Sequence, residues 1–139
     1  MSLSVISFTE NGLALSGKVR ETFTAEEVNL FTKCSFARES AEAVYVEEST
    51  GQWAGKQMEE GNALLFIGAC GIAVRAAAPW IKDKLHDSPV LVMDEMGHFV
   101  IPVLSGHMGG ANELAERISK VMGAVPVITT ATDLNRKFA

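Results

Sequence analysis

The chain has 139 residues, which is typical of one domain and long enough to bury a hydrophobic core. Hydrophobic residues make up 47% of it and charged residues 21%, and no apolar run approaches the roughly 20 residues of a membrane-spanning helix. The formal net charge is −5, and Lys and Arg form no cluster, which argues against nucleic acid as a partner. These features predict one soluble domain that binds neither membranes nor nucleic acids.

The start of the chain and its cysteines indicate the compartment. The N-terminus lacks the basic start and the apolar middle of a secretory signal, which favours a cytoplasmic location. Cys34 and Cys70 are the only cysteines, so they suggest neither a disulfide framework nor a four-ligand zinc site. We expect free thiols, with Cys70 a small buried side chain rather than a nucleophile.

The first half of the chain gives weak signals before a clear one. Residues 4–8 and 44–47 read as short strands, and residues 25–40 as mixed helix or strand. Helix formers fill residues 52–60 before a glycine, and the apolar run 63–67 fits a strand buried on both faces.

The second half alternates strands and helices through glycine turns. Residues 68–71 supply a turn and residues 72–85 a helix, in which Pro79 either forms a kink or starts a second segment. Residues 90–93 and 98–104 read as a hairpin joined by a glycine-containing turn.

The helix at residues 111–122 has the strongest pattern. Its apolar residues recur at helical spacing, its charges pair at i,i+4, and Gly123 closes it before a short strand at residues 125–128. The whole alternation predicts a three-layer α/β fold, with a largely parallel sheet, helices on both faces and an antiparallel hairpin.

Three loops of chemical interest each follow a predicted strand: residues 68–71, 105–110 and 129–133. Ligands of open α/β sheets bind outside the carboxyl ends of the strands. If the strands are parallel, all three loops share one edge, so we expect one common cleft.

The stretch SGHMGGAN at residues 105–112 is the most informative. A glycine-rich turn entering a helix brings backbone N–H groups to a carboxylate or phosphate, although the glycines can equally serve tight strand-to-helix packing. His107 is a candidate general base or oxyanion donor, or a residue that caps the turn. Ser105 is a candidate nucleophile, but a helix cap is the favoured reading. The P-loop and dinucleotide patterns are both absent.

The other two loops offer further candidates. Arg75, one turn into the predicted helix, can fork onto a ligand carboxylate or form a surface salt bridge. The hydroxyls and the carboxylate of the last loop can face a ligand, or reflect strand propensity and a helix cap; they belong to Thr129, Thr130, Thr132 and Asp133.

The acidic and histidine side chains elsewhere carry weaker signals. Asp94 and Glu95 can bind a metal or act as acids, but in a hairpin tip such residues usually serve the turn itself. His86 and His98 have no partner at metal-ligand spacing, and the charged residues around His86 read as a solvated helix end.

Several stretches together resemble the signature of the CbiG N-terminal family. They are FIGACGIAVR at 66–75, VMDE at 92–95, FVIPVLSGHMGGANELA at 99–115 and PVITTATD at 126–133. The resemblance covers about residues 64–138 and implies a hydrolase of cobalamin biosynthesis. Such enzymes open the ring A δ-lactone of cobalt-precorrin 5A and release acetaldehyde, giving cobalt-precorrin 5B. The substrate carries its own cobalt, so no protein cofactor or metal site is expected.

This chemistry suggests roles for the candidate residues. We expect His107 to activate water against the lactone carbonyl while amides near Gly109 and Gly110 stabilise the oxyanion, with Asp94 and Ser105 as further catalytic candidates. The corrinoid is a polycarboxylate, and the residues expected to bind it are Gly68, Gly71, Arg75, Gly106, Gly109, Gly110, Asn112, Thr129, Thr130, Thr132 and Asp133.

The chain is shorter than the resemblance implies for a complete protein. Family members continue into a middle region and a C-terminal domain, whereas residues 1–139 read as one N-terminal-type domain. Two alternatives stay open: a corrinoid-binding module without catalysis of its own, and a small-molecule transferase with a doubly wound fold. Homo-oligomerisation, or contact with the missing regions, is open too.

Overall fold

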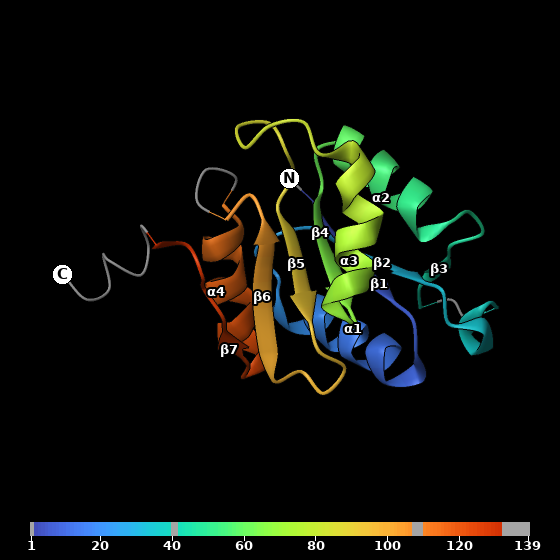
Figure 1. Ribbon diagram of the computed structural model, residues 1–139. Helices are drawn as coiled ribbons and strands as arrows, with labels where there is room; N and C mark the ends of the chain where they lie inside the picture. The colour runs from blue at the N-terminus through green and yellow to red at the C-terminus, as the bar shows by residue number, and fades with distance from the viewer. Residues whose placement is uncertain (1, 40–41, 107–109, 132–139) are drawn as a thin grey trace.

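The computed structural model describes residues 2–39, 42–106 and 110–131 (Figure 1). Within these residues seven strands form one sheet in the order β3-β2-β1-β4-β5-β6-β7. The strands are β1 (Leu3–Ser7), β2 (Val28–Thr32), β3 (Val44–Tyr45), β4 (Ala63–Ile67), β5 (Val90–Met93), β6 (Phe99–Leu104) and β7 (Val125–Pro126). The helices are α1 (Glu10–Thr22), α2 (Thr50–Glu59), α3 (Cys70–Ala77) and α4 (Ala111–Met122), with short 3₁₀ turns η1 (Ser35–Ala37) and η2 (Ala78–Trp80).

The sheet is largely parallel, with one reversal. Strands β1 to β5 all run the same way, whereas β6 pairs antiparallel with β5, and β7 is parallel to β6. The hairpin between β5 and β6 therefore reverses the strand direction, so that β6 and β7 run opposite to β1 to β5. The predicted α/β class, including its antiparallel hairpin, is confirmed.

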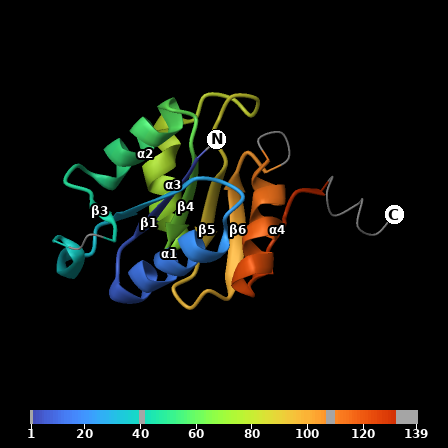
Figure 2. The ribbon, with the colours of Figure 1, turned by 180° about the vertical axis from the view of Figure 1, so that it is seen from behind.

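Two helical layers cover the sheet, as the opposite views of Figures 1 and 2 show. Helices α1 and α4 pack on one face through residues such as Val19 and Ile118, and α2 and α3 pack on the other through residues such as Trp53 and Ala73. All five residues of β4 are buried, because this central strand has a helical layer on each side. No helix in the described part of the chain is long and apolar enough to cross a membrane.

Local signals set the helix boundaries. The hydroxyl of Thr9 accepts a hydrogen bond from Gly12 N and caps α1, and Ser49 caps α2 through Gln52 N. Gly123, with a φ of 70°, ends α4 as predicted. The helix predicted for residues 72–85 is too long: α3 ends at Ala77, Pro79 lies in η2, and an irregular segment leads to β5.

The strands finish and start at two opposite sides of the sheet. These sides are called the carboxyl edge and the amino edge, after the ends of the parallel strands that lie there. At the carboxyl edge β1, β2, β4 and β5 end and β6 begins, at the bottom of Figure 1. At the amino edge these strands begin and β6 ends, at the top of Figure 1. The first and last residues of β6, which is six residues long, are separated by roughly 17 Å, because a strand rises about 3.3 Å per residue.

Candidate functional site

The three candidate loops do not share one edge, which corrects the prediction of a common cleft. Gly68 follows β4 and lies at the carboxyl edge. Ser105 follows β6, which runs antiparallel to β5, so it lies at the amino edge. The hydroxyl of Thr130 accepts a hydrogen bond of 2.6 Å from Asn112 Nδ2, in the first turn of α4, so the chain after β7 returns to the amino edge. The physical reason is the hairpin, which reverses the chain before the glycine-rich loop.

Ser105 anchors the glycine-rich loop to the start of β5. Its hydroxyl donates a hydrogen bond of 3.0 Å to the carbonyl of Asp87, and its φ of 61° is in the left-handed region. The side chain does not cap α4: Gly110 is the N-cap residue, with no side-chain cap, and it is the Ser105 carbonyl that accepts from Ala111 N. The favoured reading of Ser105 as a helix cap is therefore wrong. Its hydroxyl is instead engaged with the backbone carbonyl of Asp87.

Gly106 allows the loop to touch α4. A Cβ at this position would lie 2.7 Å from Asn112 Oδ1, closer than real Cβ contacts, and 3.3 Å from Thr130 Cγ2, which is also tight. The carbonyl of Gly106 also accepts from Asn112 N, at 2.9 Å. Glycine is thus required here for close packing of loop and helix.

The N-terminus of α4 is partly satisfied by the loop itself. The backbone N–H groups of Ala111 and Asn112 donate to the carbonyls of Ser105 and Gly106. Two of the helix's first N–H groups are therefore already engaged and do not bind an anion in this arrangement. An anion at this edge is therefore held by groups other than these two amides.

Four expected site residues lie outside the described residues: His107, Gly109, Thr132 and Asp133. Their roles stay predictions. Three of the described site residues, Gly106, Asn112 and Thr130, are brought together at the amino edge. Asn112 is only 6% exposed and joins Gly106 to Thr130, whereas Thr129 is exposed.

The second group of candidates lies at the carboxyl edge. The ring of Phe8 packs beside Gly68, where a Cβ would lie 3.4 Å from Phe8 Cδ2. Arg75 is exposed in the last turn of α3, and its Nη1 would lie 3.9 Å from a Cβ on Gly71. Cys70 begins α3 and is exposed, which corrects the expectation of a buried thiol.

Asp94 serves the hairpin turn, the reading that the sequence favoured. Its Oδ1 accepts hydrogen bonds from the N–H groups of His98 and Phe99, at 2.8 and 2.7 Å. Neighbouring Glu95 accepts from the hydroxyl of Thr9, at 3.0 Å. Because both acids lie at the carboxyl edge, Asp94 cannot share one catalytic centre with Ser105.

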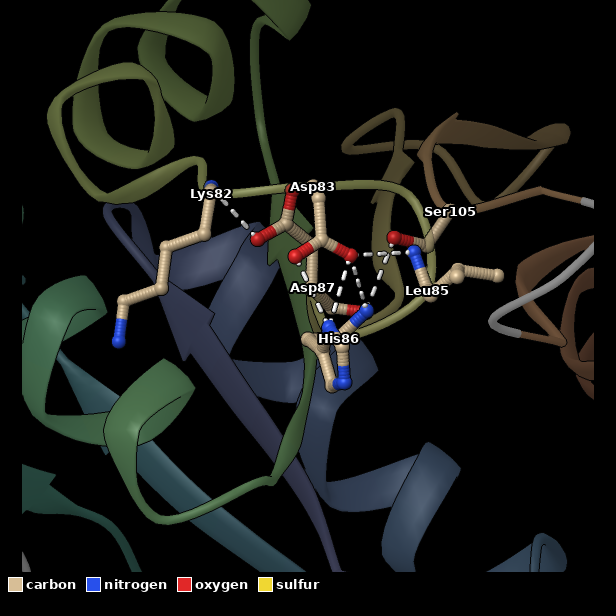
Figure 3. A network of polar contacts seen from close by, with 6 residues as sticks. All are labelled: Lys82, Asp83, Leu85, His86, Asp87 and Ser105. Carbon is tan, nitrogen blue, oxygen red and sulfur yellow. Dashed lines mark hydrogen bonds and ion pairs between the residues drawn. The ribbon is translucent and has the colours of Figure 1, made fainter.

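The irregular segment after η2 forms a polar network at the amino edge that the sequence did not predict (Figure 3). The carboxylate of Asp83 accepts from Leu85 N and His86 N, and lies 2.8 Å from His86 Nδ1. Asp87 Oδ1 accepts from Lys82 N, also at 2.8 Å. The hydrogen bond from His86, together with that from Leu85 N, lowers the pKa of the Asp83 carboxyl. In the sequence, the network is indicated only by the spacing of Asp83 and His86, and this spacing is equally typical of an ordinary solvated turn.

A cavity of about 550 Å³ adjoins this segment and lies between it and α2. Its lining includes Met58, Trp80, Ile81, Lys82, His86 and Asp87. Within the described part of the chain, no group of three or more His, Cys, Asp or Glu side chains is arranged to hold a metal ion.

A largely parallel sheet with helices on both faces, and a glycine-rich loop beside buried polar side chains at one edge, defines an α/β domain of the kind that binds small molecules. Residues 52–133 match the family described as Cobalamin synthesis G N-terminal, and the chain belongs to this family. The family resemblance seen in the motifs is thereby confirmed.

Named relatives agree with this assignment. The chain is 57% identical over 78 residues to the cobalt-precorrin-5A hydrolase of Salmonella typhimurium, and 34% identical over 134 residues to that of Priestia megaterium. These alignments cover 56% and 96% of this chain, but 22% and 36% of the relatives, so the chain spans about a third or less of their length. The fold matches the crystal structure of a cobalamin biosynthesis protein G homolog from Sulfolobus solfataricus, with a TM-score of 0.69 at 23% identity, over 92% of this chain and 36% of that one.

Proposed function

We propose that this domain acts in cobalamin biosynthesis as part of a cobalt-precorrin-5A hydrolase. The observation that carries the proposal is the 57% identity over 78 residues to the Salmonella typhimurium protein of that name. The family match over residues 52–133 supports it, since that range includes the whole glycine-rich loop and the first turn of α4.

The proposed reaction opens the ring A δ-lactone and then breaks a carbon–carbon bond. Water adds to the lactone carbonyl and yields a carboxylate and a free hydroxyl. The hydroxyl proton is then removed, the bond between the hydroxyl carbon and the macrocycle breaks, and that carbon leaves as acetaldehyde. The bonding electron pair stays on the macrocycle. The first step needs a base for the water and donors for the oxyanion.

The amino edge is the better location for this chemistry. His107 directly follows Gly106 in the sequence, and its imidazole is the proposed base, with amides near Gly109 and Gly110 as the oxyanion donors. The start of this loop is held against α4, because Gly106 packs together with Asn112 and Thr130. Arg75 and Asp94 are left out of this centre, because they lie at the opposite edge of the sheet.

A binding module is the second candidate function. The chain spans 22% of the Salmonella relative, so the remaining regions of such a protein can supply the catalytic groups. In that case this domain holds the corrinoid and passes it on.

One assay separates the two functions. The 139-residue chain is incubated with cobalt-precorrin 5A, and acetaldehyde is measured through NADH oxidation by alcohol dehydrogenase. We expect one acetaldehyde for each corrinoid consumed. Tight binding without acetaldehyde would establish the binding module. A chain that neither binds the corrinoid nor releases acetaldehyde would overturn the proposed function.

A further inference from the structure

Trp80 is held in one orientation although much of its ring faces solvent. Its Nε1 donates a hydrogen bond of 2.8 Å to the carbonyl of Gly51, at the start of α2. The indole lies flat against Gly55, where a Cβ would be 2.6 Å from its Cζ2. Even so, 42% of Trp80 stays exposed. A fixed indole with an open face has little rotamer entropy to lose, which suits it to bind a flat partner.

Trp80 lines a cavity rather than lying on a flat surface. It lines the cavity of about 550 Å³ together with Pro79, Ile81 and Met58. Ile81 is 48% exposed, so Trp80 and Ile81 together present apolar surface in the lining of the cavity. The volume falls within the range of about 300–1,000 Å³ typical of small-molecule sites.

A lysine and a histidine border this platform. Lys82 and His86 line the cavity, and Figure 3 shows the Lys82 side chain extending away from the polar network. The carboxylates of Asp83 and Asp87 accept hydrogen bonds from backbone N–H groups of the same segment. Glu59 adds one acidic group on the α2 side. The chemistry presented is an apolar face bordered by Lys82 and an imidazole.

One hydrogen bond links the lining of the cavity to the glycine-rich loop. Asp87 lines the cavity, and its carbonyl accepts the hydrogen bond from Ser105 Oγ, at 3.0 Å. A ligand that fills the cavity therefore reaches the segment to which the glycine-rich loop is bonded. A large planar molecule can contact both.

We propose that the cavity between α2 and residues 79–88 is a corrinoid-binding subsite, in which Trp80 and Ile81 pack against one face of the macrocycle and Lys82 binds a peripheral carboxylate. The inference rests on the proposed function and adds to it the place of the macrocycle. The macrocycle is broad and flat, with acetate and propionate groups around its rim, so it matches an apolar platform with a cation at its border.

Binding of cobyrinic acid, a corrinoid with free carboxylates, tests the subsite in the 139-residue chain by titration calorimetry. Trp80→Ala should raise Kd about tenfold, and Trp80→Phe, which keeps a ring, much less. Lys82→Gln should raise Kd about three- to tenfold, and this effect should shrink at high salt. Lys18→Gln, on an exposed position of α1, is the matched control and should leave Kd unchanged.

Circular dichroism and Tm of each variant show whether it is folded. If Trp80→Ala does not fold, Ile81→Ser and Lys82→Gln carry the test, because both side chains are largely exposed. Folded variants that bind cobyrinic acid within twofold of wild type would overturn the subsite, as would a wild-type chain that does not bind it. Acetaldehyde release from cobalt-precorrin 5A is measured separately, so a failed subsite leaves the proposed function standing when release is seen.

Discussion

Position 106 has no room for a side chain, because a Cβ there would lie 2.7 Å from Asn112 Oδ1. The sequence left two readings of the loop glycines open, close packing and an anion site. At Gly106 the structure supports close packing, and the engaged amides of Ala111 and Asn112 narrow the anion site to the rest of the loop. Sequence pattern alone could not decide between them, because both need the same residue type.

Gly106→Ala should lower the free energy of unfolding by about 1–3 kcal/mol, since overpacking forces the loop away from α4. Thermal and urea unfolding measure the change. Gly17→Ala is the matched control: nothing lies within 4 Å of its Cβ position in α1, so it should raise stability by about 0.5–1 kcal/mol. A Gly106→Ala chain as stable as wild type would show that the loop has room to adapt.

His107→Ala should lower turnover by about 10²- to 10⁴-fold with little change in substrate affinity, as expected for the loss of a general base. Ser105→Ala should lower it far less, because the Ser105 hydroxyl is bonded to the carbonyl of Asp87. Steady-state acetaldehyde release by the active protein measures both. The opposite ranking of the two variants would make Ser105 the nucleophile and contradict the proposed mechanism.

Single elements followed their sequence signals where those signals were local. Helix α4 begins and ends as predicted, because apolar periodicity and Gly123 agree. Helix α1 was missed: it contains Gly12 and Gly17 and lacks a clear apolar stripe, although the cap Thr9 marks its start. The helix predicted through residue 85 ends at Ala77, and Pro79 lies in the 3₁₀ turn that follows. The charged residues at 82–87 were interpreted as a solvated helix end. Their hydrogen bonds to backbone groups cannot be predicted from the residue types alone.

The order of residues 82–87 should depend on pH through Asp83. The hydrogen bonds from His86 and Leu85 N lower the pKa of this carboxyl in the folded chain. Its contribution to stability is therefore complete above the unfolded value, about 3.9, and is lost as the pH falls through the lower folded value.

Amide hydrogen exchange at Leu85 and His86, followed through this acidic range, measures the effect. Protection should fall with pH in wild type, and Asp83→Asn should be unprotected at pH 7 already. Equal protection in the two chains at pH 7 would mean that the carboxylate does not organise the segment.

At the scale of the whole molecule, the fold class predicted from the sequence is correct, but the predicted common site is not. The sequence predicted the layers, the parallel strands and the hairpin, but not its consequence, that the loop after β6 and the chain after β7 lie at the other edge. Loops that follow strands meet only when those strands run the same way, and strand direction is a property of the complete sheet. Arg75 and Ser105 were therefore grouped together although strands of the sheet separate them.

Arg75→Ala should leave corrinoid affinity within about twofold of wild type, because the Arg75 guanidinium lies beside Gly71, near the carboxyl edge. Asn112→Ala should weaken binding about tenfold, since Asn112 joins the glycine-rich loop to Thr130. Titration with cobyrinic acid compares the two folded variants. A tenfold loss for Arg75→Ala alone would place the ligand at the carboxyl edge.

The location of the bound corrinoid tests the central claim most directly, and a crystal structure of the chain with cobyrinic acid provides it. We expect the macrocycle at the amino edge, with one face on Trp80 and its rim beside the loop that begins at Ser105. An ordered corrinoid at the carboxyl edge, between Phe8, Gly68 and Arg75, would contradict the account.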